Sequence, residues 1–439
     1  MSPSTTPLRF AARGDVSALD ATQRAALFER TTSGDTSVRE GTTRMLARVR
    51  AEGDAALLAF AREFDGATLT ALEVPRTQWD AALHALDPAL RAALERAAAN
   101  IRTVHEAFRP TAREVTTPDG AVIGRRPDPL ARVGVYAPGG RATYPSSLLM
   151  GAIPARVAGV REVIVCSPPD ASGAPSAVLL AAAAIAGVDR LFAVGGAGAV
   201  GAMAYGTASI PAVDRIVGPG NAWVAEAKLQ VSGVVGIDSP AGPSELLVLA
   251  DASASPVVIA REMLAQAEHD PVAAVVLVTD APMLVSAVER ELNARIDAEP
   301  RAEVIRAAFA ARGALLTVPS RAEAVSFANT WAAEHLLLAV ATDGQDETLA
   351  QLRSAGTVFV GETASVAFGD YMSGANHVLP TGGLSRIWSG LSTLDFVRWT
   401  TWQKIGRDTA RSLARDVDIF ATAEGLPAHA ATARQWGNT

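Results

Sequence analysis

Apolar residues recur three and four positions apart along the early part of the chain. The stretches Val38 to Glu52 and Pro88 to Ala107 show this spacing most clearly, with charged residues between the apolar ones. Such spacing is typical of amphipathic helices that bury one face. We therefore expect residues 1–130 to form an N-terminal helical lead-in.

From about Arg132 the pattern changes to short β-type runs that alternate with helical segments. The first series is RVGVYAP, VREVIVCSPP, DRLFAV and VDRIVG, and a second series near Glu245 begins with ELLVLAD and continues through AAVVLVTD, ALLTV and TVFVG. Alternation of this kind is typical of βαβ units and parallel sheets. The sequence predicts an α/β fold with two Rossmann-like α/β domains whose sheets are rich in parallel strands, at residues 131–243 and 244–389.

The pattern is helical again from about Leu391 to the end of the chain. We expect residues 390–439 to form a small C-terminal helical extension. No repeat of solenoid period is present, although an ancient duplication could relate the two α/β halves.

Composition narrows the functional classes. With 439 residues, 49% of them apolar, the chain can bury a large core. A net charge of −7 argues against a nucleic-acid surface. The run from Ala177 to Val188 is too short to cross a membrane, which takes about 20 residues. The first residues do not resemble a secretory signal, and the single cysteine, Cys166, allows no intramolecular disulfide, so we expect a cytoplasmic protein.

Four of the six histidines lie beside carboxylates, amides, glycine or proline at the ends of predicted elements, where loops often hold reactive groups. The other two, His84 and His105, are expected to be ordinary surface or packing residues. Gln266 and His269 lie three apart on a predicted helix, where they could share a metal or where His269 could cap the helix. The four candidates are His269, His335, His377 and His429.

Adjacent carboxylate and imidazole groups suit proton transfer, and Glu334 and His335 form such a pair just before an apolar, strand-like run. Asp370 lies in a glycine-rich segment with His377, either as a metal ligand or as a turn-forming residue. Gln266, His269, Asp370 and His429 would suit a catalytic zinc if the fold brings them together, which spacing alone does not establish.

A glycine-rich segment, VGGAGAVGAMAYG, follows a predicted strand and opens a helix. Gly196, Gly198 and Gly201 match G-x-G-x-x-G, with Asp214 beyond them, which indicates either a dinucleotide site or tight packing of a helix on a sheet. The turns at Val135–Ser147 and Val217–Trp223 also lie at strand ends, where α/β sheets bind ligands.

Seven segments, taken in order, make the chain similar to the histidinol dehydrogenase family over nearly its whole length. They are RVGVYAPGGRATYPSSLLM, GPGNAWVAEAK, GIDSPAGPSELLVLAD, LAQAEHDP, the Glu-His pair, GDYMSGANHVLPT and EGLPAH. This resemblance implies zinc- and NAD-dependent oxidation of L-histidinol through an aldehyde to L-histidine. It also implies a homodimer in which the C-terminal segment completes the site of the neighbouring subunit.

The resemblance assigns roles to individual residues. Glu334 and His335 would perform acid–base catalysis, while zinc would be held by Gln266, His269, Asp370 and His429. Substrate contacts would come from the residues of both sets together with Ser244, His377 and Glu424. The NAD contacts would be Tyr136, Asn221 and position 198, where the family usually has Gln and this chain has Gly198.

Two other kinds of protein share part of this pattern. A related zinc- and NAD-dependent dehydrogenase of another small polar alcohol, such as a sulfonated diol, would keep the metal and the Glu334–His335 pair but not the groups that recognise histidinol. A zinc-binding or assembly protein that has lost catalysis is the second alternative. A zinc hydrolase is disfavoured because the chain contains no H-E-x-x-H segment.

Overall fold

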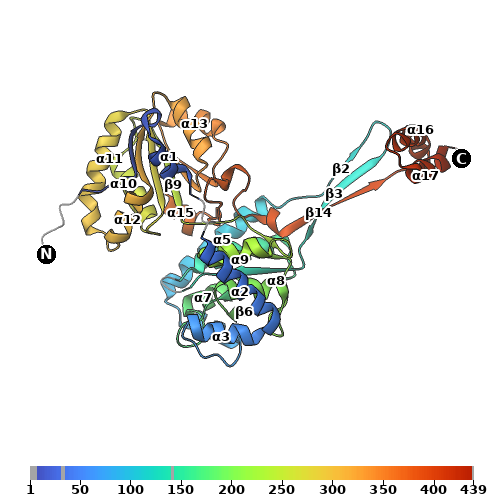
Figure 1. Cartoon of the computed structure of the whole chain (residues 1–439), viewed down its shortest axis with the longest axis horizontal. Coiled ribbons are helices and arrows are strands. Elements are labelled where there is room, and N and C mark those ends of the chain that lie inside the picture. The colour runs from blue at the N-terminus through green and yellow to red at the C-terminus, as the bar shows by residue number, and fades with distance from the viewer. Residues whose placement is uncertain (1–6, 31–34, 140–142, 438–439) are drawn as a thin grey trace.

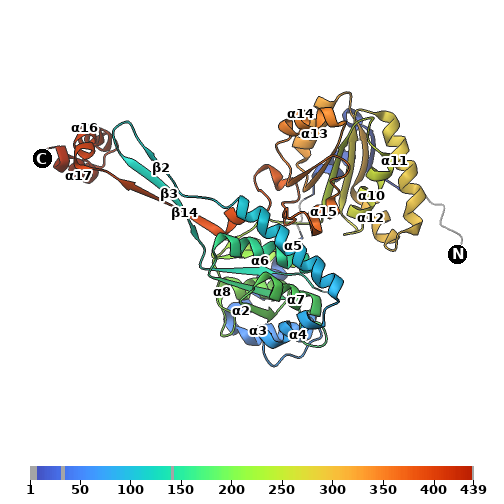
Figure 2. The same cartoon turned by 180° about the vertical axis from the view of Figure 1, so that it is seen from behind.

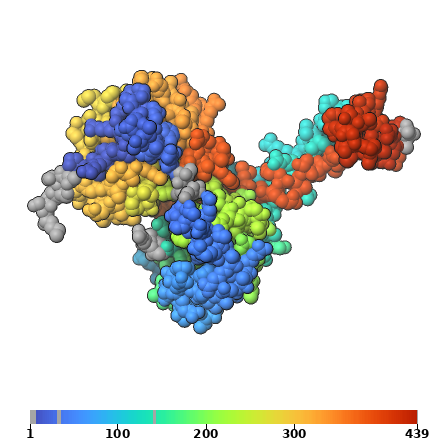
Figure 3. All heavy atoms as spheres, in the orientation of Figure 1, coloured from blue at the N-terminus to red at the C-terminus, as the bar shows by residue number. Residues whose placement is uncertain are grey.

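The computed structural model describes residues 7–30, 35–139 and 143–437. Two α/β bodies lie next to each other, and a narrow arm that ends in two helices projects away from both of them (Figures 1 and 2). The space-filling view shows the same separation between the tip of the arm and the two bodies (Figure 3).

The first body contains a five-stranded sheet in the order β6-β5-β4-β7-β8, in which every pair of neighbours is parallel. The order reverses between β4 and β7, which places a topological switch point at the carboxyl ends of these two strands. Its elements are β4 (Arg132–Tyr136), α6 (Pro145–Ala158), β5 (Glu162–Ser167), α7 (Ala177–Ala186), β6 (Arg190–Ala193), α8 (Gly196–Tyr205), β7 (Arg215–Val217), α9 (Ala222–Val231) and β8 (Gly236–Ile237).

Helices from the N-terminal part of the chain cover this sheet. They pack mainly on α6, α7, α8 and α9, and their buried apolar residues join the two cores of the first body. Asp87 caps the longest of these helices by accepting hydrogen bonds from the amides of Ala89 and Leu90. These helices are α2 (Thr36–Glu52), α3 (Asp54–Phe64), α4 (Arg76–Ala85) and α5 (Pro88–Ala107).

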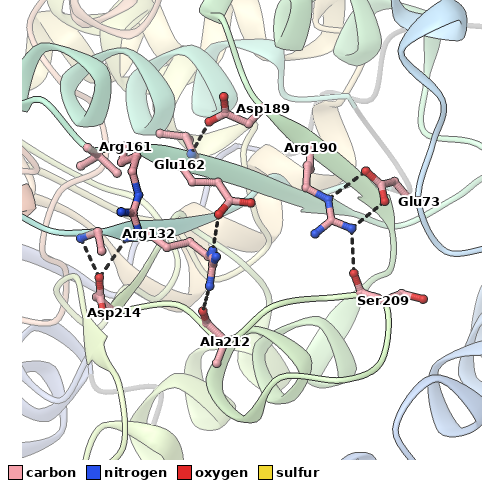
Figure 4. A network of polar contacts seen from close by, with 12 residues as sticks. Glu73, Arg132, Arg161, Glu162, Asp189, Arg190, Ser209, Ala212 and Asp214 are labelled. Atoms are coloured by element: carbon pink, nitrogen blue, oxygen red, sulfur yellow. Dashed lines mark hydrogen bonds and ion pairs between the residues drawn. The ribbon is translucent and has the colours of Figure 1, made fainter.

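Polar side chains tie together the amino ends of the strands in this first sheet (Figure 4). Arg132 donates to Glu162 at 2.6 Å and to the carbonyl of Ala212 at 2.9 Å. Asp214 accepts from the amides of residues 131 and 132, at 2.8 and 2.9 Å. Asp214 therefore lies at the edge opposite the switch point, and it is not placed to bind a ribose beside Gly196.

The second body contains a six-stranded parallel sheet in the order β1-β11-β10-β9-β12-β13. Its helices begin in several cases with proline at the first turn, where the missing amide hydrogen costs nothing. Its elements after the first body are β9 (Glu245–Ala250), α10 (Pro256–Ala267), β10 (Ala274–Thr279), α11 (Pro282–Arg295), η2 (Ile296–Ala298), α12 (Ala302–Arg312), β11 (Gly313–Thr317), α13 (Arg321–Trp331), β12 (His335–Ala339), α14 (Thr342–Gln351), β13 (Thr357–Val360), α15 (Val366–Tyr371) and η3 (Leu384–Arg386).

The predicted helical lead-in also contributes strands. β1 (Ala12–Asp15) forms the edge of the second sheet beside β11, and it is followed by η1 (Val16–Ala18) and α1 (Ala21–Phe28). The next helix along the chain, α2, belongs to the first body. The start of the chain is thus shared between the two bodies.

The arm is an antiparallel three-stranded sheet with a helical pair at its tip. The strands are β2 (Arg113–Thr116), β3 (Val122–Pro129) and β14 (Val397–Lys404), which follows η4 (Thr393–Phe396). The tip is formed by α16 (Arg407–Ala423) and α17 (Pro427–Gly437), which pack on each other. The C-terminal extension is therefore helical only beyond β14. Among the described residues, no helix is long and apolar enough to span a membrane.

Candidate active site

Glu334 and His335 lie at the turn from α13 into β12, at the amino edge of the second sheet, and both are buried. Ala332 makes this turn with a φ of 54°, and it is the one non-glycine residue with a left-handed backbone in the part of the chain that the structure describes. A left-handed alanine is strained and persists only where its surroundings hold it. The turn thus fixes the direction in which the Glu-His pair enters the sheet.

The backbone of Glu245, the first residue of β9, contacts both members of the pair. Its amide donates to Glu334 Oε2 at 2.7 Å, and its carbonyl lies 3.0 Å from His335 Nδ1. A carbonyl only accepts, so Nδ1 carries the hydrogen. The other nitrogen, Nε2, is buried without a hydrogen-bond partner. His335 thus presents Nε2 as the nitrogen that is free to accept a proton.

Asp370 lies in α15 with its Oδ1 atom 3.6 Å from His335 Nε2. Burial lowers the pKa of His335, but the charge of Glu334 and the contact with Asp370 raise it further, to about 10. Burial raises the pKa of Asp370, but the 3.6 Å contact with His335 outweighs this effect and holds that pKa below its usual value. The two carboxylates therefore stabilise a proton on His335, and a cation that neutralised Asp370 would lower this pKa and free Nε2 to accept a proton.

His377 joins the second body to the first. Its Nδ1 atom lies 2.9 Å from the carbonyl of Asp370, and its Nε2 atom lies 3.2 Å from the hydroxyl of Ser147 in α6. Because Nδ1 must donate to the carbonyl, Nε2 accepts from Ser147. Burial lowers the pKa of His377, which favours this neutral form. The amino edge of the second sheet therefore faces the carboxyl edge of the first.

Gln266 and His269 lie at the end of α10. Gln266 is buried in the last turn, whereas the helix ends at Ala267 and leaves the exposed His269 just beyond it. The prediction that both residues lie within the helix is therefore wrong for His269. A turn keeps them close, since the amide of His269 donates to the carbonyl of Gln266 at 3.3 Å.

A cavity of about 540 Å³ opens between the two bodies beside His269. Apolar residues of α5 and α6 form one wall, and the ends of α10 and α15 form the other. Its polar lining includes Glu268, His269, Arg301 and Tyr371. Such a cleft is large enough for a small polar substrate.

Two candidate residues lie elsewhere. His429 is in α17 and Glu424 follows α16, so both are on the tip of the arm, which projects away from both bodies (Figures 1 and 2). Within the single chain, the structure therefore does not bring them to the other candidates. Ser244 does lie at the amino edge of the second sheet, directly before β9.

The second body contains three of the four proposed zinc ligands, namely Gln266, His269 and Asp370. The imidazole of His269 lies close enough to Asp370 to influence its pKa, and these groups together with the Gln266 amide are ligand types that zinc accepts. No group of three or more His, Cys, Asp or Glu residues placed to hold a metal occurs in the described ranges. Gln266, His269 and Asp370 offer three donors, so a four-coordinate zinc would need one more.

The candidate NAD residues gather at the switch point of the first sheet. Tyr136 ends β4, and its hydroxyl accepts from the amide of Gly196 at 3.1 Å. Asn221 caps α9 by accepting from the amides of residues 223 and 224, which leaves its NH₂ group available as a donor. This edge of the sheet suits a dinucleotide. Residues 140–142 of the adjoining turn lie outside the described residues.

The glycine motif has a packing role. A Cβ atom at Gly198 would lie 3.0 Å from Phe60 and 3.3 Å from Leu57, both in α3, and one at Gly201 would lie 3.0 Å from Leu46 in α2. These glycines let α8 approach the N-terminal helices closely. Position 198 has no side chain with which to hold a cofactor.

Three residues near the site were not identified in the sequence. Ser147 belongs to a segment that the sequence indicated only as a turn, Glu245 was not singled out, and Arg30 carried no signal. Glu245 follows Ser244 at the start of an apolar run, and such a charge inside a buried strand is the one clue that could have found it.

The comparisons with known proteins agree with one another. The histidinol dehydrogenase family matches residues 28–435. The chain is 50% identical over 409 residues to the histidinol dehydrogenase of Natronomonas pharaonis, covering 93% of this chain and 95% of that protein. It is 47% identical to that of Bordetella parapertussis, with 91% of each chain covered. The crystal structure of histidinol dehydrogenase from Elizabethkingia anophelis superposes with a TM-score of 0.92 at 31% identity, covering 98% of this chain and 99% of that one. The chain thus belongs to the histidinol dehydrogenase family.

Proposed function

We propose that this protein is a cytoplasmic dehydrogenase that oxidises L-histidinol to L-histidine through histidinaldehyde, using zinc and two molecules of NAD. The proposal rests on membership of the family and on one observation above all. His335 holds its unpartnered Nε2 atom beside Asp370, with Glu334 adjacent, and it lines a small pocket together with Asp370 and His377.

The two residues of the pair would act in successive steps. His335 Nε2 would take the proton of the substrate hydroxyl while the hydride leaves the same carbon, which produces the aldehyde. Glu334 would then take a proton from a water molecule as the water oxygen attacks the aldehyde, which gives the hydrate. The hydrate would pass its hydride to the second NAD and its two hydroxyl protons to His335, which has by then released the first proton, and to solvent, which leaves the carboxylate. NAD, when bound, supplies the hydride acceptor for both oxidations.

Zinc would be held by Gln266, His269 and Asp370 together with His429 of the partner subunit. A zinc ion at this place would orient the substrate amine and imidazole and would neutralise Asp370. Ser244, His377 and Glu424 would contact the substrate. Tyr136 and Asn221 would contact NAD, and backbone groups near Gly198 would replace the missing side chain.

A homodimer would bring the arm of one subunit to the cleft of the other. The arm exposes apolar side chains that a solitary chain leaves in water, with Ile419 58% and Phe420 70% exposed. Apolar residues are also exposed on the second body, including Phe368 in α15 at 60% and Ile387, directly after η3, at 75%. Such patches are typical of surfaces that a partner covers.

The catalytic pair is tested by two variants of the zinc-loaded protein. We expect His335→Asn to lower kcat about 10²- to 10⁴-fold, because the first proton acceptor is lost. We expect Glu334→Gln to form the first equivalent of NADH from histidinol and then to stall. Stopped-flow measurement of NADH absorbance separates the two steps.

The control is His84→Gln, because His84 is an exposed histidine of α4. It should leave kcat unchanged. Near-normal turnover of His335→Asn, with zinc still bound, would show that His335 does not take the alcohol proton.

A further inference from the structure

Arg30 and Glu245 form a buried ion pair next to Glu334 and His335. Arg30, which follows α1, places Nη1 2.6 Å from Glu245 Oε2, and both side chains are only 2% exposed. Arg30 also stacks on the ring of Trp331 at 3.7 Å and donates to the carbonyl of that residue. Glu245 Oε1 accepts from the amide of Gly382 at 2.8 Å. The carboxylate of Glu245 is thus held from two directions.

The same residue meets the catalytic pair through its backbone. The amide of Glu245 donates to Glu334, and its carbonyl accepts from His335 Nδ1. A rotation of the Glu245 backbone would therefore disturb both contacts at once. Arg30 pairs with the side chain of Glu245, and the backbone of Glu245 forms the hydrogen bonds to Glu334 and His335.

We propose that Arg30 and Glu245 are positioning residues, whose buried ion pair orients Glu334 and selects the tautomer of His335 in which Nε2 is free. This inference rests on the proposed function, in which that nitrogen accepts the alcohol proton. Neither residue reaches the cleft, so both act through the Glu-His pair.

Stability alone does not account for this ion pair. Taking two charges out of water costs more than most buried pairs return, and apolar residues of similar volume often stabilise a protein as well or better. The pair joins the N-terminal segment, β9 and the loop that follows His377, which are far apart in the sequence. Charge-assisted hydrogen bonds have a preferred direction, so the ion pair can fix the orientation of the Glu245 backbone. Apolar side chains at the same positions would not fix that orientation.

The main test replaces both charges at once. The double variant Arg30→Met with Glu245→Met leaves no unpaired charge, so it should fold. We expect its kcat to fall about tenfold to a hundredfold while KM for histidinol changes little, because orientation is lost and not binding. The single variant Arg30→Lys keeps the positive charge beside Glu245. Its kcat should therefore lie between that of the double Met variant and that of the native protein.

The matched control is Arg132→Met with Glu162→Met. This ion pair also lies at the amino ends of strands, but in the first sheet and away from the catalytic pair (Figure 4). Its removal should lower the unfolding temperature without changing kcat. If the double Met variant proves too unstable to purify, Arg30→Gln with Glu245→Gln leaves no unpaired charge and keeps an acceptor for the amide of Gly382, and the same selective loss of kcat is expected.

A second readout does not depend on turnover. Nitrogen-15 NMR of histidine-labelled, zinc-loaded protein should show His335 with hydrogen on Nδ1 alone in the native chain and a mixture of tautomers in the double variant. A folded double variant with unchanged kcat and an unchanged His335 signal would overturn the proposal. Failure of the native protein to form NADH from histidinol would instead overturn the proposed function, and the NMR comparison would still decide whether the ion pair orients His335.

Discussion

His335 and His105 are both buried histidines, but their surroundings differ. His335 lies within 4 Å of two carboxylates, and its pKa is raised. His105 in α5 has no hydrogen-bond partner for either nitrogen, and burial lowers its pKa to about 4. The first environment stabilises a positively charged imidazole, whereas the second keeps an imidazole neutral.

His105 should make the protein sensitive to acid. Its pKa is about 6.5 in the unfolded chain and about 4 in the folded one, so the unfolded state binds the extra proton between these values. The free energy of unfolding should therefore fall as the pH drops from about 6.5 to 4. His105→Leu should reduce this loss, as measured by urea unfolding at pH 7 and pH 5. An identical pH dependence in both proteins would contradict the assignment.

The residues of the site differ in how far the sequence revealed them. Glu334, His335 and Asp370 stand in short segments of unusual composition, so chemistry alone pointed to them. Arg30 and Ser147 reach the site through contacts with residues more than 200 positions away. The Ser147 contact depends on how the two bodies dock, and the Arg30 contact depends on how the N-terminal segment packs on the second body. No local pattern encodes either.

At the scale of elements, the switch point of the first sheet depends on close approach of two loops. Gly218 follows β7 with a φ of +115°, and a Cβ atom there would lie 2.1 Å from the carbonyl oxygen of Tyr136. The amide of Gly218 donates to Asp238, and its carbonyl accepts from Lys228, which forms a buried ion pair with Asp238. The loop between β7 and α9 is thus held against the end of β4.

Gly218→Ala should disturb both stability and cofactor binding. The added methyl group meets backbone in a conformation that alanine avoids, so we expect a loss of about 2–5 kcal/mol in the free energy of unfolding. NAD affinity, measured by calorimetry, should fall with it. Gly233→Ala is the control, because a Cβ atom there meets nothing within 4 Å. Equal stability of the two variants would contradict this account of the loop.

The strands and helices of the two α/β bodies could be predicted because each carries its own apolar pattern. The predicted helix at Pro88 to Ala107 coincides with α5, and the β-type runs coincide with strands of the two sheets. The arm could not be predicted in the same way. All four residues of β2 are exposed, so no buried face marks that strand. β14 contains exposed and half-buried residues, and its partner β3 lies far away in the sequence.

For the whole molecule, the decisive feature is the distance between the arm and the cleft. His429 and Glu424 are at the tip of the arm, whereas Gln266, His269 and Asp370 are in the second body (Figure 1). A site that needs both groups must therefore be shared between two copies of the chain. This arrangement would make every active site dependent on dimer formation.

Mixed dimers test this sharing directly. We expect His335→Asn and His429→Ala each to be inactive alone. Co-expressed in equal amounts, they should regain about a quarter of native activity, because half of the dimers then contain one intact site of two. Light scattering should show a dimer in every preparation. No recovery of activity in confirmed mixed dimers would place both residues in the same subunit's site.

The central claim is that one site performs two successive oxidations of histidinol. The most direct test counts NADH formed for each histidinol consumed by the purified, zinc-loaded protein. We predict two NADH per histidinol, with activity lost on chelation and restored by zinc. One NADH per histidinol with release of the aldehyde, or no NADH at all, would contradict this account.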